Sequence, residues 1–186
     1  MLTGGNGAGK STFYRLFLEP AGLKFVNADL VAAQFKGQQP EEFSYVASRI
    51  AAQLRNDLLK EGVSFCFETV FSHPSKIDFI AEAKALGYEV ILVFIHLQTD
   101  ELNQARVAQR VTEGGHDVPA NKIISRIPRT LGHIRTVLPL VDQAQIYDNS
   151  SQSEPFLGIA HLEKNQITQK MDPLPKWAKQ ILRDYI

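Results

Sequence analysis

The stretch that decides the fold is Gly4-Gly5-Asn6-Gly7-Ala8-Gly9-Lys10-Ser11, followed by Thr12. It matches the phosphate-binding pattern G-x-x-x-x-G-K-[ST], known as the Walker A motif or P-loop, at every fixed position. Its glycines allow positive φ, so that consecutive N–H groups can point at phosphate oxygens, and the positive end of the following helix adds to the attraction. We therefore expect residues 4–12 to bind the phosphates of a nucleotide, with Lys10 on the β- and γ-phosphates and Ser11 on Mg²⁺.

The residues around this loop predict a strand before it and an amphipathic helix over residues 11–19 after it. A chance glycine-rich turn is the alternative interpretation, and the order strand, loop, helix argues against it. Only Met1, Leu2 and Thr3 precede Gly4, whereas a first strand of this kind has about five residues. We expect a shortened first strand, from a late start site or a truncated chain, and a corresponding loss of stability.

Composition indicates one globular domain over residues 1–186, since 44% of the residues are hydrophobic and 22% are charged. Twenty basic residues balance twenty acidic ones, so the net charge favours neither nucleic acid nor a membrane as a partner. Cys66 is the single cysteine and cannot form an intrachain disulfide. There is no signal pattern, and the longest apolar run, residues 90–95, is too short to span a bilayer. We expect a cytoplasmic protein.

Alternating strand and helix patterns predict an α/β fold, a three-layer P-loop NTPase sandwich with a mostly parallel five-stranded sheet. A C-terminal hairpin and helix over residues 151–186 are expected as an edge addition to this domain. The predicted strands after the first are residues 23–27, 63–67, 88–97 and 144–147, with hairpin strands at 155–162 and 166–171. The predicted helices are residues 41–60, 74–86, one capped by Thr99 or Asp100, 120–138 and one containing Trp177. Helical spacing predicts a buried apolar stripe on two of them. The stripe over residues 41–60 is Phe43, Val46, Ala47, Ile50, Leu54 and Leu58, and the stripe over residues 120–138 is Ile123, Ile127, Leu131, Ile134 and Leu138.

Two carboxylates follow strands of the predicted sheet. Asp29 comes after the second strand, and Glu68 ends the third, with Thr69 beside it. Ligands of open α/β sheets bind beyond the carboxyl ends of the strands, the edge that also carries the phosphate loop. We therefore expect both acids to face the ligand.

Two larger classes that share the loop are disfavoured, because the chain lacks their motifs. ATP-binding-cassette proteins need a signature like L-S-G-G-Q and a hydrophobic strand ending in Asp-Glu, and neither is present. Ras-type GTPases need N-K-x-D, whereas residues 121–124 read N-K-I-I. What remains is a small phosphotransferase, in which an acid orients the acceptor hydroxyl and arginines stabilise the transferred phosphoryl group.

Taken together, the loop and four further stretches resemble the zeta-toxin family of kinases. These stretches are Asn27-Ala28-Asp29, Phe67-Glu68-Thr69, residues 110–119 and Ile146-Tyr147-Asp148-Asn149. The resemblance spans about residues 1–150 and is closest to the compact chromosomal members. It implies ATP-dependent phosphorylation of a sugar hydroxyl, the 3′-hydroxyl of UDP-N-acetylglucosamine in the family's best-known activity.

The resemblance also implies roles for individual residues. Asp29 matches the catalytic aspartate that accepts the hydroxyl proton, Glu68 and Thr69 match the acceptor-binding stretch, and Lys10 belongs to the catalytic set. Arg110 matches the first arginine of a lid over about residues 106–130. The second lid arginine falls on His116, which departs from the family, so either His116 serves or Arg126 or Arg106 replaces it. We expect Arg126 to contribute to ATP binding.

Plainer interpretations of these residues stay open at this stage. Asp29 could be a helix N-cap or lie in a surface turn, Glu68 could be a solvated loop residue, and Arg110 could lie on a solvated helix face. The chain as a whole could instead be a kinase for another acceptor. It could also be a nucleotide-binding, toxin-like module that an antitoxin neutralises. No pair of metal-binding residues has zinc spacing, so Mg²⁺ with ATP is the metal implied.

Overall fold

The computed structural model describes residues 1–35, 40–115 and 117–186, with the backbone alone for residues 40–44. The described residues form two compact units. The smaller unit consists of Met1 and Ser11–Thr69, and the larger unit of Leu2–Lys10 and Val70–Ile186. We describe each unit by itself, and the expectation of a single domain remains a prediction.

The smaller unit begins with the helix that follows the phosphate loop. The α-helical turn α1 (Lys10–Phe13), whose first residue still belongs to the larger unit, continues as the π-helical segment η1 (Tyr14–Leu18) and the 3₁₀ turn η2 (Glu19–Ala21). Gly22 ends this segment with a left-handed φ of 68°, which glycine adopts without strain. The remaining elements are β2 (Lys24–Val26), α2 (Ala28–Ala33), α3 (Pro40–Lys60) and β3 (Phe65–Thr69), with β2 parallel to β3.

Helix α3 corrects one detail of the predicted core. The helical periodicity predicted that Val46 and Leu54 would be buried, but both are exposed. Ala47 of the predicted stripe is buried as expected, and Ala51 and Leu59 are buried as well. Helix α3 lies against α2. Small alanine side chains allow two helices to approach closely, whereas hydrophobic periodicity alone does not show which edge of a broad apolar stripe the neighbour covers.

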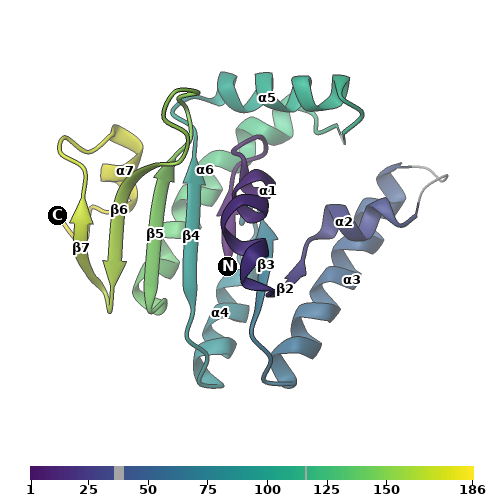
Figure 1. The fold of residues 1–186 in the computed structure, drawn as a ribbon, viewed down its shortest axis with the longest axis horizontal. Helices are drawn as coiled ribbons and strands as arrows, with labels where there is room; N and C mark the ends of the chain where they lie inside the picture. The colour runs from purple at the N-terminus through teal and green to yellow at the C-terminus, as the bar shows by residue number, and fades with distance from the viewer. Residues whose placement is uncertain (36–39, 116) are drawn as a thin grey trace. The chain divides into compact units, whose positions relative to one another are not determined.

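The larger unit is built on a sheet in the order β1-β4-β5-β6-β7 (Figure 1). Strands β1 (Leu2–Gly4), β4 (Ile91–His96) and β5 (Gln143–Asp148) are parallel, and β6 (Leu157–Glu163) and β7 (Gln166–Lys170) continue the sheet in antiparallel pairing. Strand β1 has three residues, all paired with β4. The helical elements of this unit are α4 (Ser75–Ala85), α5 (Asp100–Thr112), α6 (Ala120–Val137), η3 (Leu138–Leu140) and α7 (Lys176–Ile181).

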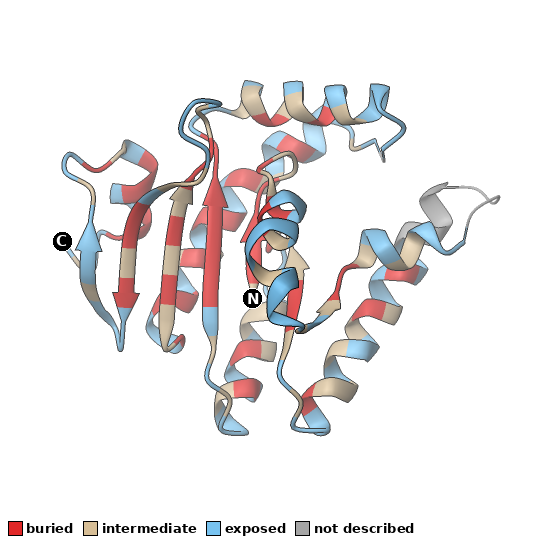
Figure 2. Ribbon diagram, viewed as in Figure 1, coloured by how far each residue is buried: buried red, intermediate tan, exposed pale blue. Residues whose placement is uncertain are grey.

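The core of the larger unit lies around β4 and α6. Residues 92–95 of β4 are all buried (Figure 2), as expected for a parallel strand covered on both faces. Helix α6 contacts α4, α5 and α7. Its buried side is the apolar stripe predicted from the sequence, Ile123, Ile127, Leu131 and Ile134, followed by Leu138.

The C-terminal hairpin and helix are also confirmed. Lys164 and Asn165 have φ values of 47° and 65°, the positive values that a two-residue type I′ turn requires. Trp177 and Ile181 of α7 are buried. The described residues thus form an α/β fold with seven strands, five in parallel pairings and two in the hairpin. None of their helices is long and apolar enough to cross a membrane.

The burial of α6 gives a stability prediction. Ile134 is 0% exposed, whereas Ile124 on the same helix is 42% exposed. We expect Ile134→Ala to lower the free energy of unfolding by about 2–4 kcal/mol, because it removes buried methyl groups and leaves a cavity. The matched variant Ile124→Ala should change it by less than about 0.5 kcal/mol. Urea denaturation measures both, and equal losses would contradict the position of α6 in the core.

Candidate functional site

The loop between β1 and α1 has a backbone that only glycine adopts without strain at three positions. Gly4, Gly7 and Gly9 have φ values of 152°, 77° and 95°. A Cβ on Gly4 would overlap the carbonyl oxygen of Ile95, its partner on β4. The glycines of the motif are therefore required by local conformation and by the close approach of β4.

Lys10 lies over this loop. Its side chain is buried, and Nζ donates a hydrogen bond of 3.0 Å to the Gly5 carbonyl. The Ala8 N–H donates to the same carbonyl oxygen over 3.2 Å. The loop is thus closed around the ammonium group, with the start of α1 next to it, which is an arrangement that attracts anions.

Three side chains from other elements hold the loop from outside. Asn103 Nδ2 on α5 donates to the Asn6 carbonyl over 2.6 Å, and Asn149 Nδ2, just after β5, donates to the Ala8 carbonyl over 2.9 Å. Arg126 Nη1 on α6 donates to Asn6 Oδ1 over 3.1 Å. Arg126 was among the predicted residues.

The sequence did not point to Asn103, and it pointed to Asn149 only as part of the stretch Ile146-Tyr147-Asp148-Asn149. Asn103 lies within a helix and Asn149 follows a strand, and neither residue belongs to a known short motif. No local signal could have shown that both reach the phosphate loop. Their hydrogen bonds span 97 and 141 residues of the chain.

The other predicted lid residues lie on or after α5. The N-cap of this helix is Thr99, which is one of the two predicted cap residues. Arg106 lies against the loop, because a Cβ on Gly7 would stand 3.3 Å from its Cβ. The Arg110 carbonyl accepts a hydrogen bond of 2.8 Å from the Gly115 N–H, so the chain turns back over Arg110 after the helix. His116 lies outside the described residues.

The predicted acids lie in the smaller unit, where Glu68 has a defined setting. At the end of β3, its Oε2 accepts hydrogen bonds from Ser11 Oγ (3.1 Å) and Asn27 Nδ2 (2.9 Å). Glu68 is therefore a half-buried, hydrogen-bonded carboxylate and not a solvated loop residue. Thr69, the last residue of β3, is also half-buried.

Asp29 lies in the first turn of α2 and is exposed. The N-cap of this helix is Asn27, whose Oδ1 accepts from the Asp29 N–H over 2.7 Å. The alternative interpretation of Asp29 as the N-cap is therefore wrong. Asn27 has two functions, because it caps α2 and also donates to Glu68.

The residues present fit a nucleotide with Mg²⁺. The described residues contain no group of three or more His, Cys, Asp or Glu side chains that could hold a metal by themselves. Mg²⁺ does not need such a group, because it takes one or two protein oxygens together with phosphate oxygens and water. The Ser11 hydroxyl beside the Glu68 carboxylate offers such oxygens.

A buried histidine lies near the loop at the end of β4. The rings of His96 and Trp177 are 4.6 Å apart, and Trp177 Nε1 donates to Asp148 Oδ2 over 3.3 Å. Burial lowers the pKa of His96 to about 4, although the Asp148 carboxylate partly opposes this shift. His96 is thus a neutral core histidine, consistent with a structural role.

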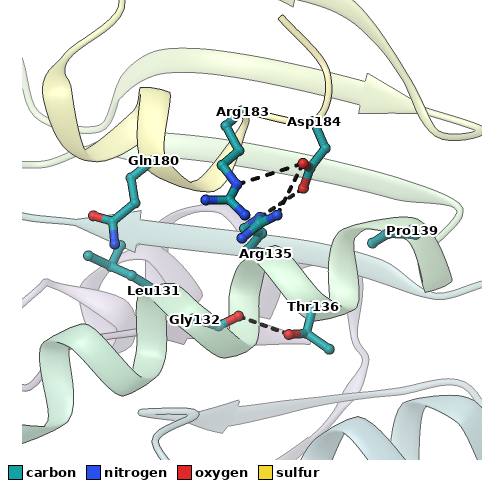
Figure 3. A pocket seen from close by; sticks show the side chains of 8 residues that line it. All are labelled: Leu131, Gly132, Arg135, Thr136, Pro139, Gln180, Arg183 and Asp184. Carbon is teal, nitrogen blue, oxygen red and sulfur yellow. Dashed lines mark hydrogen bonds and ion pairs between the residues drawn. The ribbon is translucent and has the colours of Figure 1, made fainter.

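A pocket of about 400 Å³ lies between α6 and the C-terminal segment and contains none of the predicted site residues (Figure 3). Its charged groups pair with one another. Arg135 forms two hydrogen bonds with Asp184 (2.8 and 3.1 Å), and Arg183 Nε lies 3.7 Å from Asp184 Oδ1. Its two arginines share one aspartate, and none of the predicted site residues lines it, so we do not regard it as the functional site.

The loop from a parallel strand to a helix, closed around Lys10, defines a P-loop α/β protein. Comparison with family models goes further: the model of the zeta toxin family matches residues 1–156, and the chain belongs to this family.

One similar sequence is an uncharacterized protein of Haemophilus influenzae (strain ATCC 51907 / DSM 11121 / KW20 / Rd). It is 35% identical over 113 residues, which are 61% of this chain and 80% of that protein.

Two solved structures are similar in fold. One is the AvrRxo1-ORF1:-ORF2 complex with ATP, with a TM-score of 0.68 and 20% identity over 90% of this chain. The other comes from the PezAT chromosomal toxin–antitoxin system of Streptococcus pneumoniae, with a TM-score of 0.62 and 21% identity over 84% of this chain. The matches cover 58% and 69% of those chains. At this level of identity the likeness shows the fold.

His96 gives a prediction about pH and stability. Because its folded pKa is about 4 and its unfolded pKa about 6.5, the unfolded state binds the proton first as the pH falls. Stability is therefore full above about pH 6.5 and is lost progressively toward pH 4. Between about pH 7.5 and pH 4.5 the wild type should lose free energy of unfolding as His96 takes up a proton in the unfolded state. His96→Phe should lose roughly 2–3 kcal/mol less over the same range.

The exposed His73 is the control, and His73→Gln should follow the wild type. Parallel pH profiles for wild type and His96→Phe would contradict a buried neutral histidine.

Proposed function

We propose that the chain is an ATP- and Mg²⁺-dependent kinase of zeta-toxin type that phosphorylates a sugar hydroxyl, with UDP-N-acetylglucosamine as the acceptor. The observation that carries the proposal is the glycine loop closed around Lys10 and contacted by Arg126. Membership of the zeta toxin family supports it. The AvrRxo1-ORF1 structure, which has this fold, was solved with ATP.

The larger unit carries the proposed donor residues. The N–H groups of residues 4–9 would bind the phosphates, and Lys10 would reach the β- and γ-phosphates. Ser11, which belongs to the smaller unit, would hold Mg²⁺ through its hydroxyl, and the ion would neutralise charge on the transferred group. Arg110 would stabilise the charge that develops on the γ-phosphoryl group.

The smaller unit carries the proposed acceptor residues. Asp29 accepts the proton of the sugar hydroxyl while the hydroxyl oxygen forms a bond to the γ-phosphorus. The bond between the γ-phosphorus and the bridging oxygen of the β-phosphate breaks, which releases ADP. Glu68 and Thr69 hold the acceptor. Exposure of Asp29 is consistent with this role, because a general base must be open to its substrate.

For the second lid position we assign Arg126. Its guanidinium group contacts Asn6 in the phosphate loop, 120 residues away in the chain, and arginine carries its charge at any physiological pH. His116 and Arg106 remain sequence-based alternatives for this position. The cytoplasmic location also remains a prediction.

A second candidate function is a nucleotide-binding, toxin-like module that a protein antitoxin neutralises. The Streptococcus pneumoniae relative belongs to a toxin–antitoxin system, and the AvrRxo1 structure is a complex of two proteins. ATP should stabilise the folded chain under both proposals. Only a kinase converts ATP to ADP in step with the acceptor.

The acceptor proposal is tested by mass spectrometry. Wild-type protein incubated with ATP, Mg²⁺ and UDP-N-acetylglucosamine should yield the sugar nucleotide with one added phosphate. We expect Asp29→Asn to lower the rate by about 10²–10⁴-fold, because the amide cannot take the hydroxyl proton, while ATP binding is retained. The control is Glu61→Gln, an exposed acid after α3 in the same unit, which should keep the wild-type rate. Phosphate transfer to other hydroxyl acceptors alone would reject this sugar, and full activity of Asp29→Asn would reject Asp29 as the base.

Arg126 and Arg129 provide a matched pair on α6. The Arg126 guanidinium contacts the phosphate loop, whereas exposed Arg129 donates to the Ser125 carbonyl one turn earlier. We expect Arg126→Ala to lower kcat by about 10²–10³-fold, because it removes the positive guanidinium charge that would stabilise the transferred phosphoryl group. Arg129→Ala should stay close to the wild type. Steady-state kinetics with saturating ATP measures kcat, and equal rates for the two variants would remove Arg126 from the proposed site.

A further inference from the structure

We infer that Asn103 and Asn149 are positioning residues that hold the phosphate loop in its anion-binding shape before a nucleotide arrives. The inference rests on the proposed binding of ATP at this loop, but not on the proposed acceptor or on phosphate transfer. Both asparagines are buried in the larger unit, at 1% and 7% exposure. They reach the loop from different elements, α5 and the segment after β5.

Asn103 holds the first half of the loop. Its Nδ2 donates to the Asn6 carbonyl over 2.6 Å, the shorter of the two asparagine contacts with the loop. A Cβ on Gly5 would stand 2.9 Å from Nδ2, and a Cβ on Gly7 would stand 2.7 Å from the Asn103 carbonyl. Helix α5 can therefore approach the loop this closely only because positions 5 and 7 have no side chain.

Asn149 holds the second half of the loop and is itself fixed by three hydrogen bonds. Its Nδ2 donates to the Ala8 carbonyl over 2.9 Å, and its Oδ1 accepts from the Phe156 N–H over 3.2 Å. Its own backbone N–H donates to the His96 carbonyl over 2.9 Å. A Cβ on Gly9 would overlap Nδ2, so this side chain also requires a glycine of the motif.

These two contacts determine where the loop's amide groups point. In a planar trans peptide, the C=O of one residue and the N–H of the next point in opposite directions. Holding the Asn6 carbonyl against α5 therefore aims the Gly7 N–H away from α5. Holding the Ala8 carbonyl against Asn149 does the same for the Gly9 N–H. The asparagines orient donors for phosphate without touching phosphate themselves.

The unpaired oxygen of Asn103 indicates that this side chain serves to position the loop and does not serve to stabilise the fold. Its Oδ1 is buried and has no hydrogen-bond partner among the described residues, which costs folding free energy. Rotating the amide would not help, because it would place Oδ1 against the Asn6 carbonyl oxygen. A leucine of similar shape would avoid the unpaired oxygen but could not hold the loop.

The test compares ATP affinity with stability in the full chain. Isothermal titration calorimetry measures the Kd for ATP, and thermal unfolding without ligand measures Tm, for wild type, Asn103→Leu and Asn149→Asp. We expect each variant to bind ATP about tenfold more weakly, as for the loss of one hydrogen bond that orders the site. The Tm of Asn103→Leu should equal or exceed that of the wild type. Asn56→Leu, at an exposed position of α3, is the matched control and should keep the wild-type Kd.

Asn149→Asp keeps the oxygen that accepts from Phe156 but replaces the donor to Ala8, and it adds a negative charge. Its Kd is therefore measured at low and high salt, because charge repulsion is screened by salt and the loss of an orienting hydrogen bond is not. A weaker Kd that persists at high salt supports the inference, whereas one that returns to the wild-type value assigns the effect to charge and counts against it.

Several outcomes would overturn the inference. ATP affinity within twofold of the wild type in both variants would show that the loop needs neither asparagine. A loss of affinity only in variants with a lowered Tm would make them structural residues. A wild-type chain that binds ATP but phosphorylates no acceptor leaves the inference standing and rejects the proposed kinase. A wild-type chain that binds no ATP rejects both.

Discussion

The structure depends on a loop backbone that most residues cannot adopt. Gly4 is paired with Ile95 of β4 so closely that any side chain would meet the Ile95 carbonyl, and Gly7 and Gly9 follow with positive φ. Such a backbone turns its N–H groups toward one point, but it has no regular hydrogen-bond ladder of its own to keep that shape. The rest of the larger unit therefore has to hold it, and β4, α5, α6 and the segment after β5 all contact it.

Neutral side-chain amides make several of the hydrogen bonds that fix the predicted site residues in both units. Asn103 and Asn149 hold carbonyl groups of the phosphate loop, and Asn27 caps α2 while donating to the Glu68 carboxylate. An amide can donate and accept hydrogen bonds at once without adding charge. Next to the proposed phosphate site, these amides therefore add no charge to that of Lys10 and Arg126. Next to Glu68, an amide fixes a carboxylate without neutralising it.

The parts of the fold that the sequence predicted well are those governed by local chemistry. Residues 92–95 of β4 are continuously apolar and buried, the α6 stripe has helical spacing, and the turn at Lys164 and Asn165 needs residues that tolerate positive φ. Val46 and Leu54 on α3 were assigned wrongly, because an apolar pattern does not identify the neighbouring element. The N-cap of α2 could equally have been read from sequence, since Asn27 is a favoured cap residue directly before the helix.

By itself, the sequence determined that residues 4–11 form a phosphate loop, that parallel strands alternate with helices, and that Asp29 and Glu68 lie near the carboxyl ends of strands. These features depend on residues that are neighbours in the chain, so their spacing is enough to show them. Only the tertiary structure decided that Asn103, Arg126 and Asn149 contact the loop, across 97, 120 and 141 residues. Those contacts exist because α5, α6 and β5 pack in one particular arrangement, and a hydrogen bond between distant residues leaves no periodic or local pattern in the chain.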